Sequence, residues 1–273
     1  MAGGSYPKQT INARPKSRGP KVVFRPAPRA RVTLAELEVT RGAHIVFSRF
    51  RVRNETYNRA GAHHITYRRI KMQLFFIRGA DHISYIRSRV GPNDSDDYMN
   101  WITAPYDSND TPRHILLNRV RIYGFQKHNS GAHVDCIGID DVRGLRILNS
   151  RIWDCEHFAI IFGKDLSNRR AARNVLLQNN FIDCCGDGYY SLGLGDVEGP
   201  MMIRFNSLTQ GIGWLGGSVR RVTLDSNVIT ANSSANCNKA RWRYNVVARG
   251  SACRRGMRAR TGFRNPPRDL HLV

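Results

Sequence analysis

The chain has 273 residues, of which 41% are hydrophobic and 23% are charged, so it is long enough to enclose one large core as a single domain. Its 36 arginines and 7 lysines outweigh 21 acidic residues and give a formal net charge of +22. This excess indicates an anionic partner: a nucleic acid, an acidic polysaccharide or an anionic surface. A GC-rich genome also raises arginine content, but it would not explain an ordered arrangement. No apolar run reaches the about 18 residues of a membrane-spanning helix, so we expect no membrane span.

The N-terminal segment bears on the location of the protein. Residues 1–7 contain neither the charged region nor the apolar region of a signal peptide. We nevertheless expect a secreted or extracellular protein, whose leader would then be absent from this chain. The alternatives are a virion component or a cytosolic protein.

A nine-residue motif recurs along the chain. Its first copies are HIVFSRFRV from His44, HITYRRIKM from His64, HISYIRSRV from His82 and HILLNRVRI from His114. More diverged copies begin at Gly144, Asn174, Pro200, Arg221 and Lys239. The starts lie 18 to 32 residues apart, and the wide gaps hold polar insertions, at 92–113 and 164–173, that we expect to be loops.

The pattern inside each copy predicts a bent strand. Positions two, four, seven and nine are mostly apolar or small, so the alternation of a strand breaks once, between positions four and seven. In the later copies position seven becomes polar: Ser150, Asn180, Asn206, Asn227 and Asn245. A buried asparagine at one corner of each coil can hydrogen-bond its counterparts above and below and tolerates left-handed backbone geometry. Such a column is typical of stacked parallel coils.

A second strand per coil is also visible, beginning near Val134, Phe158, Tyr189 and Ile212. Glycine content and β-branched residues argue against helices, and hairpin signals are missing. We therefore predict an all-β fold, a single right-handed parallel β-helix (a solenoid) of roughly nine to ten coils. One domain spans residues 1–273, with an inserted loop at 92–113.

The six cysteines are too few for a disulfide scaffold, and their spacing fits no zinc site. Cys237 and Cys253 flank one strand-like segment, so a disulfide between them would staple the C-terminal end at 237–253. Cys155 occupies a place that matches Cys184 and Cys185 in the adjacent repeat, so these could stack or bond. Free buried thiols are the alternative reading.

The staggered strands, the asparagine column and the opening GSYPKQTI…VVFRPAPRARVTLAELEV resemble the pectin-lyase-like right-handed parallel β-helix superfamily. Its polysaccharide-lyase-type members and secreted bacterial β-helix proteins are the most similar. The resemblance covers roughly residues 6–247 and is specific for the fold, whereas the same helix serves lyases, hydrolases, epimerases and phage adhesins. In lyases of this superfamily, Ca²⁺ or arginine neutralises a uronate carboxylate, and a basic side chain removes the neighbouring proton.

Basic residues recur at two outward positions of the motif. Position eight holds Arg51, Lys71, Arg89, Arg121 and Arg151, and position six holds Arg49, Arg69, Arg87 and Arg119. Because neighbouring coils lie about 4.8 Å apart, equivalent residues form columns, which we expect to bind a polyuronate chain through bidentate carboxylate contacts. The alternative is a solvated face neutralised by an acidic loop: Asp94, Asp96, Asp97, Asp107 and Asp110.

Acidic residues and histidines form a second candidate group, for catalysis. Aligning the starts of the second strands brings Asp135, His157 and Asp187 into register, with His133 and Glu156 nearby. Such a column could share protons, bind a metal or act as acid and base, although turn caps explain it equally well. The resemblance implies Arg119 and Arg121 as neutralisers, and as base Lys127, His128, His133 or Tyr123. The predicted catalytic set is His133, Asp135, His157, Asp187, Lys127 and Arg121.

The sequence contains no established metal-binding motif. The hydrolase motifs of the superfamily are missing as a set, since Asp140–Asp141 alone is a poor match. No acidic cluster has Ca²⁺-site spacing, so Ca²⁺ is a candidate cofactor by resemblance alone and we assign no metal ligands. His44, His64, His82 and His114 open four coils. They could form a metal column, but a turn-capping stack is favoured, because ligands at one edge rarely converge.

Aromatic residues near the basic half divide into two groups. Tyr67 and Tyr85 occupy the inward position four, so we expect them in the core. Tyr98, Trp101 and Tyr106 belong to the inserted loop and are candidate ligand contacts.

Three functions compete. The first is the binding and β-eliminative cleavage of an acidic, uronate-containing polysaccharide, which would make the chain a polysaccharide lyase. The second is a non-catalytic carbohydrate-binding or adhesive module of the cell-surface or phage-tail type. Nucleic-acid binding through charge ranks last, because no recognition motif is present. We expect a monomer.

Overall fold

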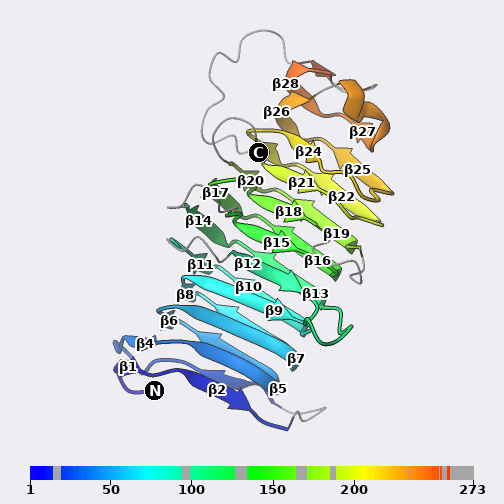
Figure 1. Ribbon diagram of the computed structural model, residues 1–273. Coiled ribbons are helices and arrows are strands. Elements are labelled where there is room, and N and C mark those ends of the chain that lie inside the picture. Colours follow the sequence, from blue (N-terminus) through cyan, green and yellow to red (C-terminus); the bar gives the residue numbers. More distant parts are fainter. Residues whose placement is uncertain are drawn as a thin grey trace.

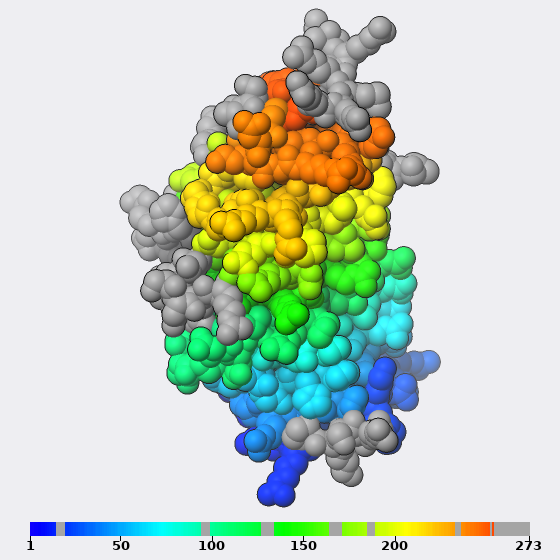
Figure 2. Space-filling model, turned by 90° about the vertical axis from the view of Figure 1, so that its right-hand side faces the viewer, coloured from blue at the N-terminus to red at the C-terminus, as the bar shows by residue number. Residues whose placement is uncertain are grey.

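The computed structural model describes residues 1–14, 20–93, 99–126, 134–163, 171–184, 189–232, 234–251, 253 and 257–258. In this part of the chain short parallel strands stack coil upon coil into a parallel β-helix (Figure 1). The coils follow one another in sequence order along the long axis, as the colour bands of Figure 2 show. No helix in the described ranges is long and apolar enough to cross a membrane.

The described strands form three ladders. Ladder one has twelve strands: β1 (Gly4–Tyr6), β4 (Val32–Leu34), β6 (Arg51–Val52), β8 (Lys71–Met72), β11 (Arg89–Val90), β14 (Arg121–Phe125), β17 (Arg151–Cys155), β20 (Phe181–Ile182), β23 (Ser207–Leu208), β26 (Val228–Asn232), β28 (Val246–Gly250) and β29 (Met257–Arg258). This exceeds the nine to ten coils predicted, because β1, β4 and β29 lie outside the nine copies of the motif.

Ladders two and three share the two longest strands, β5 (Leu37–Ser48) and β7 (Glu55–Arg68). Ladder two adds β3 (Val22–Phe24), β10 (Asp81–Ile86), β13 (Arg113–Asn118), β16 (Arg143–Leu148), β19 (Arg173–Gln178), β22 (Met201–Arg204), β25 (Val222–Asp225) and β27 (Arg241–Arg243). Ladder three adds β2 (Gln9–Asn12), β9 (Leu74–Arg78), β12 (Asn100–Thr103), β15 (Ile137–Ile139), β18 (Ile160–Phe162), β21 (Leu192–Leu194) and β24 (Ile212–Trp214). A 3₁₀ helix, η1, spans Ser234–Asn238.

The prediction of a loop over the whole insertion at 92–113 was wrong, because part of the insertion is a strand. Its residues Asn100–Thr103 form β12, which pairs with β9 on one side and with β15 on the other. The segment therefore contributes a rung to ladder three. The reason is that the coil needs a third side at this level, and Ile102 fills the core position there, with no accessible surface.

The core is built from the inward positions of every rung. Tyr67 and Tyr85 are fully buried, as predicted, and their rings stack 4.6 Å apart. Their hydroxyls are satisfied, because Tyr67 donates to Asn58 (2.8 Å) and Tyr85 lies 2.7 Å from the Thr56 hydroxyl. Burial raises the pKa of both phenols, so they remain neutral packing groups.

The corner predicted between positions four and seven is confirmed, and it lies at position six. There φ runs from 49° to 63° in Arg49, Arg69, Arg87, Arg119, Asn149, Asn179, Phe205, Ser226 and Tyr244. The left-handed residue is thus one position before the asparagine column. Asn180, Asn206 and Asn227 of that column are buried, and the backbone N–H of each donates to the side-chain oxygen of the next asparagine (2.9–3.0 Å). Their Nδ2 groups repeat the contact at 2.8–3.0 Å.

Two disulfides clamp the described coils. Cys237 is bonded to Cys253, the pair predicted from the sequence. Cys155 is bonded to Cys136 rather than to Cys184 or Cys185, because the Cα atoms of Cys136 and Cys155 lie only 5.4 Å apart across adjacent coils. None of the described cysteines is free.

Candidate functional site

The basic residues of position eight form a continuous column on ladder one. Each pairs in register with the next: Arg51 with Lys71, Lys71 with Arg89, Arg89 with Arg121, and Arg121 with Arg151. The first four are exposed and Arg151 is half-buried. The next rung replaces the arginine with Phe181. This arrangement agrees with the column predicted from the motif.

The basic residues of position six form the second column, one residue away around the corner. Arg49, Arg69, Arg87 and Arg119 are all exposed and all adopt left-handed backbone geometry. That geometry costs an L-residue about 1 kcal/mol or more, and less for asparagine than for most others. Four consecutive coils therefore carry arginine at a corner where the fold alone favours asparagine or glycine.

A groove runs between the two columns. One hollow of about 450 Å³ is lined by Arg69, Lys71, Arg87, Arg89, Arg119 and Arg121, with Ile70 and Ser88 between them. The adjoining hollow of about 480 Å³ is lined by Arg119, Arg121, Asn149, Arg151, Asn179, Phe181 and Phe205, with Val120, Ser150 and Asn180 between them. Because the hollows share Arg119 and Arg121, they form one channel along the helix axis, which we call the basic groove. Arg49 and Arg51 lie beyond its lining.

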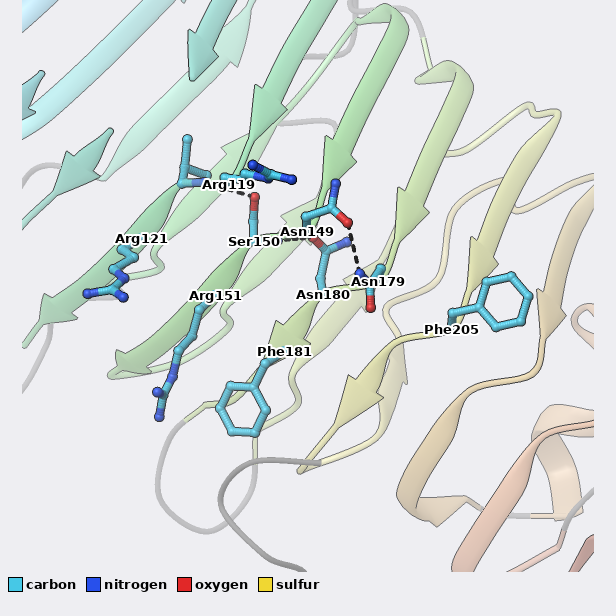
Figure 3. Close-up of a pocket in the computed structure, with 10 residues that line it drawn as sticks. Arg119, Arg121, Asn149, Ser150, Arg151, Asn179, Asn180, Phe181 and Phe205 are labelled. Atoms are coloured by element: carbon cyan, nitrogen blue, oxygen red, sulfur yellow. Dashed lines mark hydrogen bonds between the residues drawn. The ribbon is translucent and has the colours of Figure 1, made fainter. Parts of the chain in front are cut away.

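Figure 3 shows the end of the basic groove that lies toward the C-terminal coils, which we call its far end. Arg121, Arg151 and Phe181 stand in a row on neighbouring strands, while Asn149 and Asn179 lie on the corner side. Asn179 Nδ2 donates to Asn149 Oδ1 at 2.8 Å, and Asn149 Nδ2 donates to Asn118 Oδ1 at 3.1 Å. The groove thus passes from a purely basic stretch into one of amides and aromatic rings. The Phe205 ring is 44% exposed at this end.

No described carboxylate forms an ion pair with the column residues from Arg49 to Arg121. Neither hollow is lined by an acidic residue. The described ion pairs lie elsewhere, at Lys8, Arg59 and Arg173, and around Asp81. Within the described coils, eight basic side chains of the columns have no ion pair: Arg49, Arg51, Arg69, Lys71, Arg87, Arg89, Arg119 and Arg121.

The acidic loop does not neutralise the columns through the residues that the structure describes. Asp107 and Asp110 line a separate hollow of about 560 Å³, together with Tyr106 and Arg78. There the Arg78 guanidinium lies 5.0 Å from the Tyr106 ring centre. Asp94, Asp96, Asp97 and Tyr98 lie outside the described residues. The Trp101 ring lies 6.5 Å from that of Tyr106, and neither residue lines the basic groove.

An aromatic strip runs beside the basic column, which the sequence reasoning did not identify. Tyr123 and Trp153 pair in register and their rings stack 4.8 Å apart. Arg89 lies 5.9 Å from the Tyr123 ring centre, and Arg151 lies 4.8 Å from that of Trp153. The signal was available, because both aromatics follow a position-eight arginine by two residues and so share its outward face.

Two described members of the predicted catalytic set, Asp135 and His157, do not line the basic groove. Asp135 is 5% exposed, and its Oδ1 accepts a hydrogen bond from the Phe158 backbone N–H at 2.9 Å. His157 is 1% exposed and packs on Tyr189, with ring centres 4.1 Å apart. Ile137 pairs with Ile160, so Asp135 is level with Phe158 and not with His157.

Asp135 and His157 are therefore buried at the turn that precedes ladder three. The register predicted between them was wrong by one residue. Neither lines a hollow that contains Arg121. His133, Asp187, Lys127 and His128 lie outside the described residues. Tyr123 is the candidate base that lies among the described residues, and it is beside the arginines.

Comparisons with protein-family models, with curated proteins and with solved structures find no match to this chain. The site is a linear, strongly cationic channel with an amide and aromatic end. It can bind a long anion through several guanidinium groups at once.

Proposed function

We propose that the basic groove binds an acidic, uronate-containing polysaccharide lying along the helix axis. The observation that carries this is the eight basic side chains that have no ion pair within the described coils. Rungs of a parallel ladder repeat about every 4.8 Å, and the carboxylates of a polyuronate repeat on a comparable scale. One carboxylate can thus meet each rung, where it relieves repulsion between stacked like charges.

A polysaccharide fits the far end of the groove better than a polymer of phosphates alone. Phe181 and Phe205 offer apolar faces to a sugar ring, and Asn149 and Asn179 offer amide groups to its hydroxyls. Arginine grips a carboxylate bidentately, which adds direction to the charge attraction. A groove of this kind suits a secreted, extracellular or virion-borne protein, because such polymers lie outside cells. One chain provides the whole groove, so we propose a monomer.

The test is binding of polygalacturonate and alginate by calorimetry, with neutral dextran as the reference polymer. The double variant Arg89→Gln/Arg121→Gln is expected to bind about 100-fold more weakly, at about tenfold per lost charge-assisted contact. The matched control is Arg146→Gln, an exposed arginine that lies on β16 of ladder two, outside the groove lining. Equal weakening in both variants, or tighter binding of a DNA duplex than of any uronate polymer, would reject the proposal.

Cleavage of the bound chain is the second candidate, and Tyr123 favours it. Its phenol shares the outward face of β14 with Arg121 and lies beside Arg89. Superfamily resemblance implies that guanidinium groups neutralise the uronate carboxylate while a base removes the adjacent C5 proton. The C5–H electron pair then forms the C4–C5 double bond, the C4–O4 bond breaks, and the leaving oxygen takes up a proton. We place the chain in the pectin-lyase-like superfamily as part of this proposal.

Turnover is read as the ultraviolet absorbance of the unsaturated uronate. We expect an increase with the polymer that binds, abolished in Tyr123→Phe while binding remains. If no uronate polymer raises the absorbance although one binds, the groove is a carbohydrate-binding or adhesive surface without catalysis. This outcome rejects cleavage and leaves the binding proposal standing.

A further inference from the structure

A stack of imidazoles occupies the opposite corner of ladder two, at position one of the motif. His44, His64, His82 and His114 have φ values of 52° to 56°. Their rings follow one another at 4.8, 4.3 and 4.2 Å between centres. This arrangement agrees with the turn-capping stack favoured by the sequence. It also holds four imidazoles in one line across four coils, and none of the four lines the basic groove.

One coil adds a carboxylate to this stack. The residue preceding the histidine is Ala43, His63 and Arg113 in the neighbouring coils but Asp81 in the third. Asp81 pairs in register with His63 on one side and with Arg113 on the other. Its carboxylate therefore lies at the level of two stacked histidines. The significance of this residue could not be seen in the motif, because Asp81 stands just before its first position.

The ligand atoms converge at this point. Asp81 Oδ1 lies 2.9 Å from His82 Nδ1 and 2.9 Å from His114 Nδ1. The three ligand atoms all lie within 4.8 Å of one another. A metal with bonds of about 2.0–2.2 Å to nitrogen and oxygen holds its ligand atoms roughly 3–3.5 Å apart, so small side-chain rotations would complete the set. The geometry points to a divalent transition-metal site formed by Asp81, His82 and His114.

The donor atoms select the class of metal. Two imidazole nitrogens and one carboxylate oxygen suit Zn²⁺, Ni²⁺ or Cu²⁺. Ca²⁺ is disfavoured because it takes six to eight oxygen ligands. The three side chains are 41–59% exposed, which leaves the remaining coordination positions open to water or to a ligand group. An open three-ligand arrangement resembles a catalytic or ligand-binding metal site more than a closed structural one.

The site joins β10 to β13, so a bound ion would link two neighbouring coils. Binding should therefore stabilise the fold as the free metal concentration rises.

The test uses the full chain, treated with a chelator and then dialysed. Zn²⁺ and Ni²⁺ are titrated by calorimetry, and thermal unfolding is followed with and without each ion. We expect one saturable site and a rise in Tm that grows with metal concentration. Co²⁺ should give the visible absorbance of a protein-bound ion, which reports on ligands without reference to any activity.

Three variants distinguish this site from general binding by histidines. His114→Gln and Asp81→Asn are expected to weaken binding at least tenfold and to abolish the rise in Tm. His44→Gln, in the same stack but away from the carboxylate, should retain both. Circular dichroism checks that each variant is folded, and His82→Gln replaces any that is not. The proposal fails if no ion saturates one site, if Asp81→Asn binds like the original chain, or if His44→Gln loses binding equally.

Discussion

The early coils, residues 44–121, and the late coils, residues 144–247, build the same corner from different chemistry. In the early coils position six is arginine and position seven is Phe50, Ile70, Ser88 or Val120. In the late coils position seven is Ser150 followed by an asparagine ladder, and these side chains satisfy the buried corner through their own hydrogen bonds. Both versions keep φ near 55° and the same strand register.

The comparison shows that the coil does not need arginine at its corner. Asn149 and Asn179 take the same backbone geometry and also bond along the stack, from Asn179 to Asn149 and from Asn149 to Asn118. Arg87 and Arg119 take it with no ion pair in the described coils to offset the strain. Strained residues that do not serve the fold are candidates for function. In the proposed function the early coils therefore supply the basic part of the groove, whereas the late coils supply its amide and aromatic end.

In the late coils, substitution at the centre of the asparagine ladder should destabilise the fold most. We expect Asn206→Ala to produce the largest loss of stability. Asn206 is fully buried, its Oδ1 accepts two bonds from Asn180, and its Nδ2 donates to Leu177 O and Asn227 Oδ1. Alanine removes these hydrogen bonds and leaves their buried partners unsatisfied. This should lower the unfolding free energy by about 2–4 kcal/mol. Urea unfolding measures it. The control is Gln210→Ala, at an exposed position. An equal change in unfolding free energy in both variants would show that the asparagine ladder does not stabilise the fold.

An exchange between the two halves should separate stability from binding. Replacing Arg87 and Arg119 together by asparagine is expected to raise the unfolding free energy by about 1 kcal/mol, because asparagine tolerates the left-handed corner better. The same change should weaken polyuronate binding by about 10- to 100-fold through the loss of two guanidinium groups. Stability is read by urea unfolding and affinity by calorimetry.

The reverse change, Asn179→Arg, is the matched control for this exchange. It removes the hydrogen bond to Asn149 and places arginine at a left-handed position, so it should lower stability. If Arg87→Asn/Arg119→Asn destabilises the fold, the arginines are structural, and the argument from strain is wrong.

The ladders could be predicted from the sequence because their information is local and repeated. A motif of fixed internal spacing determines which residues stack, so the sequence alone predicts that Arg89 and Arg121 are neighbours. The same reasoning found the bond between Cys237 and Cys253, which flank the last copy of the motif. It failed where turn length varies between coils. Asp135 and His157 were aligned by residue type at strand starts, whereas the register is set by Ile137 and Ile160.

Other features depended on distances that a linear pattern does not contain. The Cys136–Cys155 bond joins the residue before β15 to the last residue of β17 in the neighbouring coil. These two places are not equivalent in the repeat, so their proximity cannot be predicted from it. Strand β12 has no copy of the motif and is recognised only from its partners in ladder three. Asp81 lies one residue before position one, so its approach to His114 in the next coil follows from stacking and not from the repeat alone.

The histidine stack belongs to the early coils as well, and it yields the smallest expected effect, a pH dependence of stability. Burial lowers the pKa of His64, and the neighbouring imidazoles of His82, His44 and His63 lower it further. The unfolded chain, in which the pKa is near 6.5, then binds more protons than the folded chain. Stability contributed by His64 is therefore present above about pH 6.5 and is lost as the pH falls through the lowered folded value.

His64→Gln should accordingly flatten the decline in unfolding free energy between about pH 7.5 and about pH 5. The measurement is urea unfolding across that range with a chelator present, so that release of a metal does not contribute. Asp81 acts in a separate window, since its lowered pKa removes stability only as the pH falls below 3.8. Parallel curves for His64→Gln and the original chain would show that the early coils hold their imidazoles without electrostatic cost. The late coils, which have Gly144, Asn174, Pro200 and Arg221 at the same place, would then gain nothing in acid stability from lacking them.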